Sequence, residues 1–293
     1  MKILVCVVKS PRTEAAVWQG SALARVTNAS ITLLNVVPSP ADPSMIEEDL
    51  LAVAGEMLSD LRVETRIRHG PPDREILAEI EEGGYDLIVI GAHQPLGPTQ
   101  RLLGSVALNI ARHSPVSVWI ARGTETSLDS ILACTGGREV ALPLIEASAR
   151  LAETTGACVT LFHVVTPFPS MYTGLEQFEE TLPKLLQTDT PLARHLRHGA
   201  EILAERQIPA QVEFQHGVVG DEIIRQAHEG EYDLVILGVS SSTRRLSEWL
   251  MGDVTRSVIE HVPCSVLVFK EAGDLFPDEV SSGAVDRASP TSD

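Results

Sequence analysis

The segment RHGPPDREILAEIEEGGYDLIVIGA, residues 68–92, recurs as QHGVVGDEIIRQAHEGEYDLVILGV at residues 215–239. In both copies a strand ends at His-Gly, a helical pattern of apolar residues follows, and an apolar run closes the segment. Continuous apolar strands separated by helices are typical of a parallel sheet whose crossovers are helical. The stretch therefore predicts a βαβ unit that occurs twice.

The segments on either side of this stretch recur as well. Three further pairs match: KILVCVV (2–8) with SILACTG (130–136), ASITLLNVV (29–37) with ACVTLFHVV (157–165), and HSPVSVWIAR (113–122) with HVPCSVLVFK (261–270). The first two pairs are 128 residues apart and the last pair 148, so the second half is longer. Each half reads as strand, helix, strand, helix, strand, helix-like region, strand. Asn28 and Gly156 stand where the first helix of each half should stop.

The repeat predicts an α/β protein of two tandem doubly wound domains, residues 1–122 and 130–270. We expect each to be a mostly parallel five-stranded sheet with helices on both faces. The apolar last strands would otherwise be open sheet edges, so the domains should pack as an intramolecular pseudo-dimer. Residues 273–293 are rich in Ser, Pro, Gly and Asp, which predicts a disordered tail.

Composition narrows the classes of function. The formal net charge of −17 opposes binding to nucleic acid and to anionic membrane surfaces. The first residues, MKILVCVVKS, do not read as a signal peptide, and no apolar run is long enough to span a membrane. The four cysteines form no C-x-x-C pair, which favours buried thiols in a reducing compartment. We expect a cytoplasmic protein.

The repeated motifs resemble those of the universal stress protein family, and the whole chain resembles its tandem members. Nucleotide-binding members carry Gly, two residues, Gly, nine residues and then Gly-Ser or Gly-Thr after the fourth strand. Here Gly91, Gly104 and Ser105 fit that pattern, and Gln94 replaces the second glycine. Glycine lets the backbone approach a ribose, and a helix start offers N–H groups to phosphate. The resemblance implies that ATP, with Mg²⁺, binds to this half, and that Val37 lines the base.

Other residues of the first half affect this expectation. The family's first strand ends in Asp, but this chain has Val8 there, followed by Lys9. Lys9 could offer a positive charge to phosphate, or be an exposed loop lysine. His93 and Arg101 lie in the glycine loop and could contact a ligand.

The second half departs further from the pattern. Gly238 stays, Ser241 replaces the second glycine, and the closing pair becomes Gly252 and Asp253. A carboxylate at that helix start would repel phosphate. Gly136 stands where the first-strand Asp should be, so we expect no ATP in this half.

The extra residues of the second half fall within 166–207, where His195 and His198 are three apart on an expected helix. Two imidazoles at that spacing could face a metal, but no further ligand matches, which favours a solvated helix. The leading hypothesis is a non-catalytic stress-response regulator that binds ATP and acts on unidentified protein partners. The alternatives are a nucleotide-free universal stress protein acting through protein contacts, a slow ATPase, and a sensor whose ligand sits in the insertion. A further homodimer also stays open.

Overall fold

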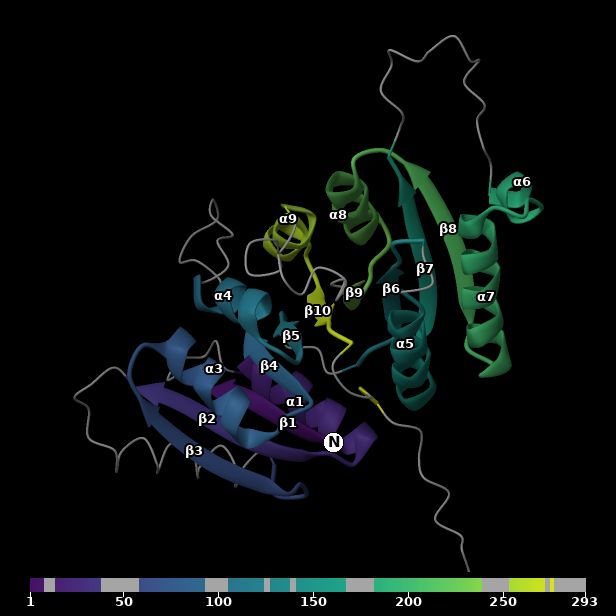
Figure 1. Ribbon diagram of the computed structural model, residues 1–293. Helices are drawn as coiled ribbons and strands as arrows, with labels where there is room; N and C mark the ends of the chain where they lie inside the picture. Colours follow the sequence, from purple (N-terminus) through teal and green to yellow (C-terminus); the bar gives the residue numbers. More distant parts are fainter. Residues whose placement is uncertain are drawn as a thin grey trace, which may run out of the picture.

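The computed structural model describes residues 1–7, 14–37, 58–92, 105–123, 127–137, 141–166, 182–238, 253–271 and 275–276 (Figure 1). The first half contains β1 (Lys2–Val7), α1 (Glu14–Thr27), β2 (Ser30–Val37), β3 (Val63–His69), α3 (Pro72–Gly83), β4 (Leu87–Gly91), α4 (Ser105–His113) and β5 (Ser117–Ala121). The second half contains β6 (Ser130–Cys134), α5 (Leu142–Thr155), β7 (Cys158–Val165), α6 (Leu182–Leu186), α7 (Pro191–Glu205), β8 (Ala210–His216), α8 (Val219–Glu229), β9 (Leu234–Gly238), α9 (Asp253–His261) and β10 (Ser265–Phe269). The segment predicted to be a disordered tail lies largely outside the described residues.

The strands of the described residues form one ten-stranded sheet in the order β3-β2-β1-β4-β5-β10-β9-β6-β7-β8. Neighbouring strands are parallel within each half. The exception is the central pair, β5 and β10, which is antiparallel and places Trp119 opposite Leu267. The last strand of each half therefore closes the open edge of the other (Figure 1). This confirms the two doubly wound halves and their packing as a pseudo-dimer.

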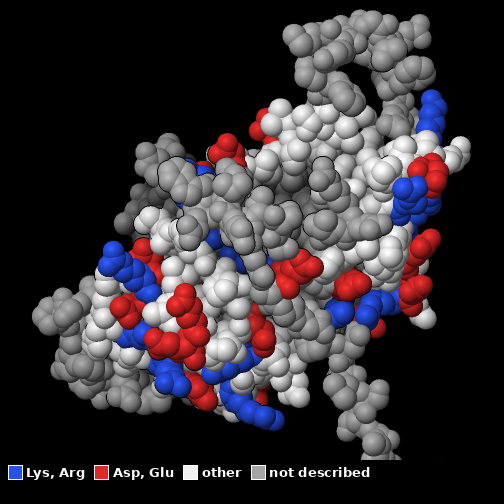
Figure 2. Space-filling view, in the orientation of Figure 1, with Lys and Arg blue, Asp and Glu red and all other residues white. Residues whose placement is uncertain are grey.

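Helices cover both faces of the sheet, and each face buries one apolar cluster. One cluster joins Val17 of α1, Leu151 of α5 and Leu196 of α7. The other joins side chains from α3, α4, α8 and α9, including Ile110 and Ile259. Both clusters contain residues of both halves, so the core is continuous across the junction. Figure 2 shows acidic and basic side chains interspersed over the described part of one face.

The ends of the first helices confirm the expected caps. Asn28 follows α1 with φ of 50°, in the left-handed region. Gly156 follows α5 with φ of 79°, and its N–H donates to the carbonyl oxygen of Ala152 at 2.8 Å. Both residue types adopt this conformation at low cost, and it lets the chain turn directly into the next strand.

Backbone and side-chain bonds tie the halves together in a reciprocal way. The Ser265 hydroxyl accepts from the Arg122 N–H at 3.0 Å, and the Ser117 hydroxyl accepts from the Lys270 N–H at 3.0 Å. The Arg122 guanidinium donates to carbonyl oxygens at the end of α9, including that of Val262 at 3.0 Å. The Lys270 ammonium donates to the carbonyl oxygen of Ser114, directly after α4. A basic side chain from each half therefore donates to carbonyl oxygens at the carboxyl end of a helix in the other.

The thiols differ in burial. The four cysteines form no disulfide. Cys6 is buried, as the sequence predicts, and burial raises its pKa to about 12. The prediction is wrong for Cys158, which is exposed because it is the first residue of β7. None of the helices in the described ranges is long and apolar enough to cross a bilayer.

Candidate functional site

The carboxyl edge of the first half has the geometry of a ligand site. The chain runs from β1 to β2 and β3 and then crosses back to β4, so the strand order reverses between β1 and β4. Connections on the two sides of such a point leave in opposite directions, and open sheets bind ligands in the crevice between them. The segments that follow β1 and β4 therefore diverge at this edge.

Three residues predicted to bind nucleotide fall at this edge. Val37 is the last residue of β2 and is buried, and its carbonyl oxygen accepts from the Gly70 N–H at 3.1 Å. Gly91 ends β4 opposite Ala121 of β5. Ser105 is exposed and begins α4. Because α4 leads into β5, which runs parallel to β4, α4 must start at the carboxyl edge.

The remaining predicted residues lie outside the described residues. They are Lys9, His93, Gln94, Arg101 and Gly104. Their contribution to the site stays a prediction from the sequence. The described part of the site therefore consists of the strand ends and the first turn of α4.

The start of α4 is electrostatically open to an anion. Its first turn carries no acidic residue, and Arg112 and His113 stand in its last turn, as the helix dipole favours. The Asn109 amide donates to the Asp73 carboxylate of α3 at 2.9 Å, which holds α4 against its neighbour. In the second half, α9 instead begins with the exposed Asp253. That carboxylate stands at the position of Ser105 and would repel a bound phosphate.

The equivalent edge of the second half is filled by its own side chains. The Thr135 hydroxyl lies 2.5 Å from Nε2 of His195, and the Thr135 carbonyl oxygen lies 2.8 Å from Nδ1 of His163. Gly137 has φ of 71°, and a Cβ there would lie 2.6 Å from Cε1 of His163. Burial lowers the pKa of His163. Helix α7 thus packs an imidazole onto the strand end that should face a ligand.

This packing corrects the interpretation of the insertion. His198 is exposed, but His195 is 3% exposed, so the expected solvated helix is wrong for His195. Within the described ranges, no three His, Cys, Asp or Glu residues are grouped so that they could hold a metal. The sequence carried one signal for this packing. When the two halves are aligned, Thr135 falls at the position of Val7 and His163 at the position of Asn35.

Comparison with known proteins identifies relatives of both halves. The model of the universal stress protein family matches residues 1–122 and 128–270. A universal stress protein structure from Archaeoglobus fulgidus superimposes with a TM-score of 0.70 over 93% of this chain and 98% of that chain, at 19% identity. A Methanothermobacter thermautotrophicus universal stress protein is 24% identical over 42% of this chain and 83% of its own length. The Na(+)/H(+) antiporter NhaS5 of Synechocystis is 27% identical over 85% of this chain, which spans only 35% of the antiporter.

Proposed function

The chain belongs to the universal stress protein family, and from that premise we propose that its first half binds ATP and acts as a regulator rather than a catalyst. The proposed ligand lies across the carboxyl edge of β1, β2 and β4. Its base contacts Val37, its ribose passes Gly91, and its phosphates face Ser105. Mg²⁺ balances part of the phosphate charge, since the protein itself is strongly acidic.

The contrast between the starts of α4 and α9 carries this proposal. Both helices follow the fourth strand of their half, at a place where the strand order reverses. One starts with a hydroxyl and has no acid in its first turn, whereas the other starts with Asp253. Phosphate binds at helix N-termini because backbone N–H groups and the dipole favour negative charge, so only the first half suits a nucleotide.

The test is a binding titration of ATP with Mg²⁺ by calorimetry on the full chain and on Ser105→Asp. This variant copies the second half at an exposed position, so the fold should persist. We expect ATP affinity to fall at least tenfold, because a carboxylate then faces the phosphates. Asp253→Asn is the matched control and should leave the affinity unchanged. If Ser105→Asp binds ATP as tightly as the natural chain, this placement of the phosphates is wrong.

We propose no chemical step at this site. The sequence offers no Walker lysine and no Ser-His-Asp order from which catalysis would be argued. An ATPase assay tests this directly. Turnover above a buffer control that disappears in Ser105→Asp would establish the slow ATPase instead.

A nucleotide-free regulator that acts through protein contacts is the second candidate. Exposed apolar side chains on α1 favour it, because Trp18 is 39% exposed and Val26 is 41% exposed. The two candidates differ in what Gln94 and Val8 do. If Gln94→Gly with Val8→Asp creates ATP binding that the natural chain lacks, the second candidate replaces the first.

We also propose that the protein works in the cytoplasm. The support is the absence of any disulfide among the four cysteines, which suits a reducing compartment. Cell fractionation with an antibody to the chain tests this. Recovery with the membrane fraction after a high-salt wash would contradict it.

A further inference from the structure

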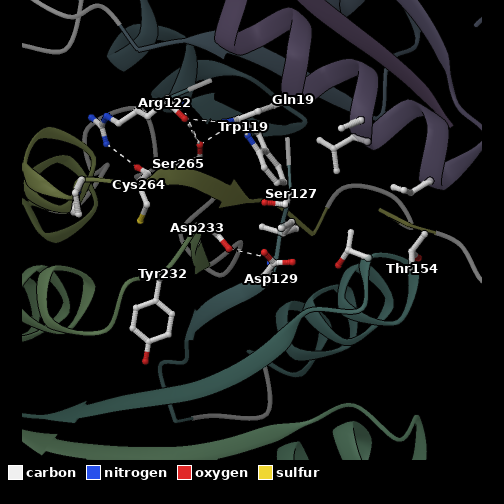
Figure 3. Close-up of a pocket in the computed structure, with 17 residues that line it drawn as sticks. Gln19, Trp119, Arg122, Ser127, Asp129, Thr154, Tyr232, Asp233, Cys264 and Ser265 are labelled. Atoms are coloured by element: carbon white, nitrogen blue, oxygen red, sulfur yellow. Dashed lines mark hydrogen bonds between the residues drawn. The ribbon is translucent and has the colours of Figure 1, made fainter. Parts of the chain in front are cut away.

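A cavity of about 350 Å³ lies at the junction of the two halves (Figure 3). Its volume is in the range of small-molecule sites. Side chains of α1 and Trp119 of β5 line one side, and the segments before β6, β9 and β10 line the other, together with Thr154 and Thr155 at the end of α5. The apolar side chains that line it are Ala22, Leu23, Val26, Trp119, Leu128 and Pro263.

The aromatic wall is held in place by a buried amide. Trp119 Nε1 donates to Oε1 of Gln19 at 2.8 Å, and the Ser265 hydroxyl donates to the same oxygen at 2.9 Å. The Gln19 amide nitrogen donates to the carbonyl oxygen of Arg122 at 2.7 Å. These bonds join α1, β5 and β10, so the indole has one fixed orientation. Trp119 is 3% exposed, so a ligand reaches only a small part of this indole, and that part is already ordered.

The charged groups of the cavity are arranged for a cation. Asp129 and Asp233 lie side by side, since Oδ2 of Asp233 accepts from the N–H groups of Asp129 at 2.8 Å and of Ser130 at 2.9 Å (Figure 3). Arg122 is the one cation among the described lining residues. Its guanidinium is committed to carbonyl oxygens of α9 and the segment after it, including that of Cys264 at 3.2 Å. The carboxylates therefore set the electrostatic preference of the cavity.

Helix α5 of the second half can be compared with α1 of the first half. On α5, Arg150 takes the place that Ala22 has on α1, and it donates to the carbonyl oxygen of Phe276 at 3.3 Å. Leu275 and Phe276 are 5% and 2% exposed and belong to the same apolar cluster as Trp119. The backbone carbonyl of Phe276 is thus bound from α5, at the position that corresponds to Ala22. On α1 the small side chain of Ala22 lines the cavity instead.

We propose that this cavity binds a small aromatic amine. The ring lies against the aliphatic side chains of α1 and the accessible part of Trp119, and the ammonium group lies at Asp129 and Asp233. Such a ligand touches both halves and the segment between them. None of the described residues that line the cavity is one predicted to bind nucleotide, so the two proposals can fail separately.

The probe is 2-phenylethylamine, added to the full chain in which Trp18→Phe and Trp249→Phe leave Trp119 as the fluorophore. We expect a saturable change in Trp119 emission. The neutral isostere 2-phenylethanol should bind about tenfold more weakly, and phenylacetate more weakly still, because a charge-assisted hydrogen bond is lost. Higher salt should weaken binding of the amine and leave binding of the alcohol unchanged.

Two variants locate the site. Asp129→Asn should lower amine affinity by about three- to tenfold without changing alcohol affinity, since Asp129 is exposed and outside the core. Glu64→Gln removes an exposed carboxylate of the edge strand β3 and is the matched control. Ala22→Arg copies Arg150, fills the cavity and should abolish binding, with the melting temperature as the check on folding.

Three results would overturn the proposal. They are no amine binding at millimolar concentration, equal affinity for amine and alcohol, and unchanged binding in Ala22→Arg. If Ala22→Arg fails to fold, the comparison of Asp129→Asn with Glu64→Gln decides, because both remove one charge from an exposed position.

Discussion

Arg122 and Lys270 stand 148 residues apart and make the same contact in opposite directions across the centre of the sheet. Each follows the last strand of its half and donates to carbonyl oxygens beyond the last helix of the other half. The two contacts are related by the approximate two-fold symmetry of the repeat. They differ in chemistry, because a guanidinium stays charged at any accessible pH and an ammonium does not.

Removing Arg122 should destabilise the protein. Arg122→Met leaves carbonyl oxygens of Val262 and Cys264 without their donor at a partly buried junction. We expect the free energy of unfolding to fall by about 2–4 kcal/mol. Urea denaturation followed by circular dichroism measures this. Arg256→Met removes an exposed ion pair with Glu260 and should cost no more than about 0.5 kcal/mol. Equal losses in the two variants would refute the interpretation.

The Lys270 contact should make stability depend on pH. Burial lowers the pKa of Lys270 from 10.5 to about 8 in the folded state. Between these values the unfolded chain binds the proton that the folded chain has lost, so the free energy of unfolding rises as pH rises through this window. Below pH 8 both states are protonated and this contribution is constant.

Lys270→Met and Lys270→Arg both remove that titration. We expect the natural chain to gain about 2–3 kcal/mol relative to either variant between pH 8 and 10.5. Comparing urea midpoints at several pH values cancels the titration of thiols and tyrosines, which all three chains share. If the urea midpoint depends on pH in the same way in all three chains, the pKa of Lys270 is not lowered by folding.

Substitution of Gly137 should lower the stability of the protein, whereas substitution of its neighbour Gly136 should not. Gly137→Ala forces a left-handed conformation on alanine and directs its Cβ at the His163 ring, so we expect a loss of about 1–3 kcal/mol. A Cβ at Gly136 meets no atom within 4 Å. Gly136→Ala should therefore be neutral or slightly stabilising in the same melting experiment. A larger loss at Gly136 would mean that the strand end is arranged differently.

The two halves bury equivalent polar side chains that differ in charge. Glu79 is 6% exposed, accepts from the Tyr85 hydroxyl at 2.8 Å and pairs with Arg68 at 2.8 Å. In the second half, Gln226 takes the place of Glu79 and Gln215 that of Arg68.

Arg68→Gln alone should cost about 3 kcal/mol, because it leaves a buried carboxylate without its main cation. Adding Glu79→Gln reproduces the pair of the second half and should recover most of that loss. A thermal-denaturation double-mutant cycle measures the coupling. Strictly additive effects would show that Arg68 and Glu79 do not act as a pair.

The internal repeat made the architecture predictable from the sequence. A strand order and a pseudo-dimer follow once HSPVSVWIAR and HVPCSVLVFK are recognised as equivalent apolar strands, because each needs a partner. The position of Val37, Gly91 and Ser105 at one edge follows from the parallel order. The caps at Asn28 and Gly156 follow from local chemistry.

Contacts between distant segments were not predictable. Gln19 meets Ser265 across 246 residues, and no local pattern marks either residue as a partner. The burial of His195 depends on Thr135, which is 60 residues away on another element. Such pairs are set by how helices dock on the sheet, which periodicity leaves open.

The antiparallel pairing of β5 with β10 has a consequence for assembly. In a dimer of separate chains, two such strands meet with a probability that depends on protein concentration. Joined by a short segment, they meet at a high effective concentration that dilution does not change. In a dimer of two identical chains a mutation changes both halves, whereas in this single chain it changes only one half. The single chain can therefore carry Ser105 in one half and Asp253 in the other, and every molecule in the cell is the same unequal pair.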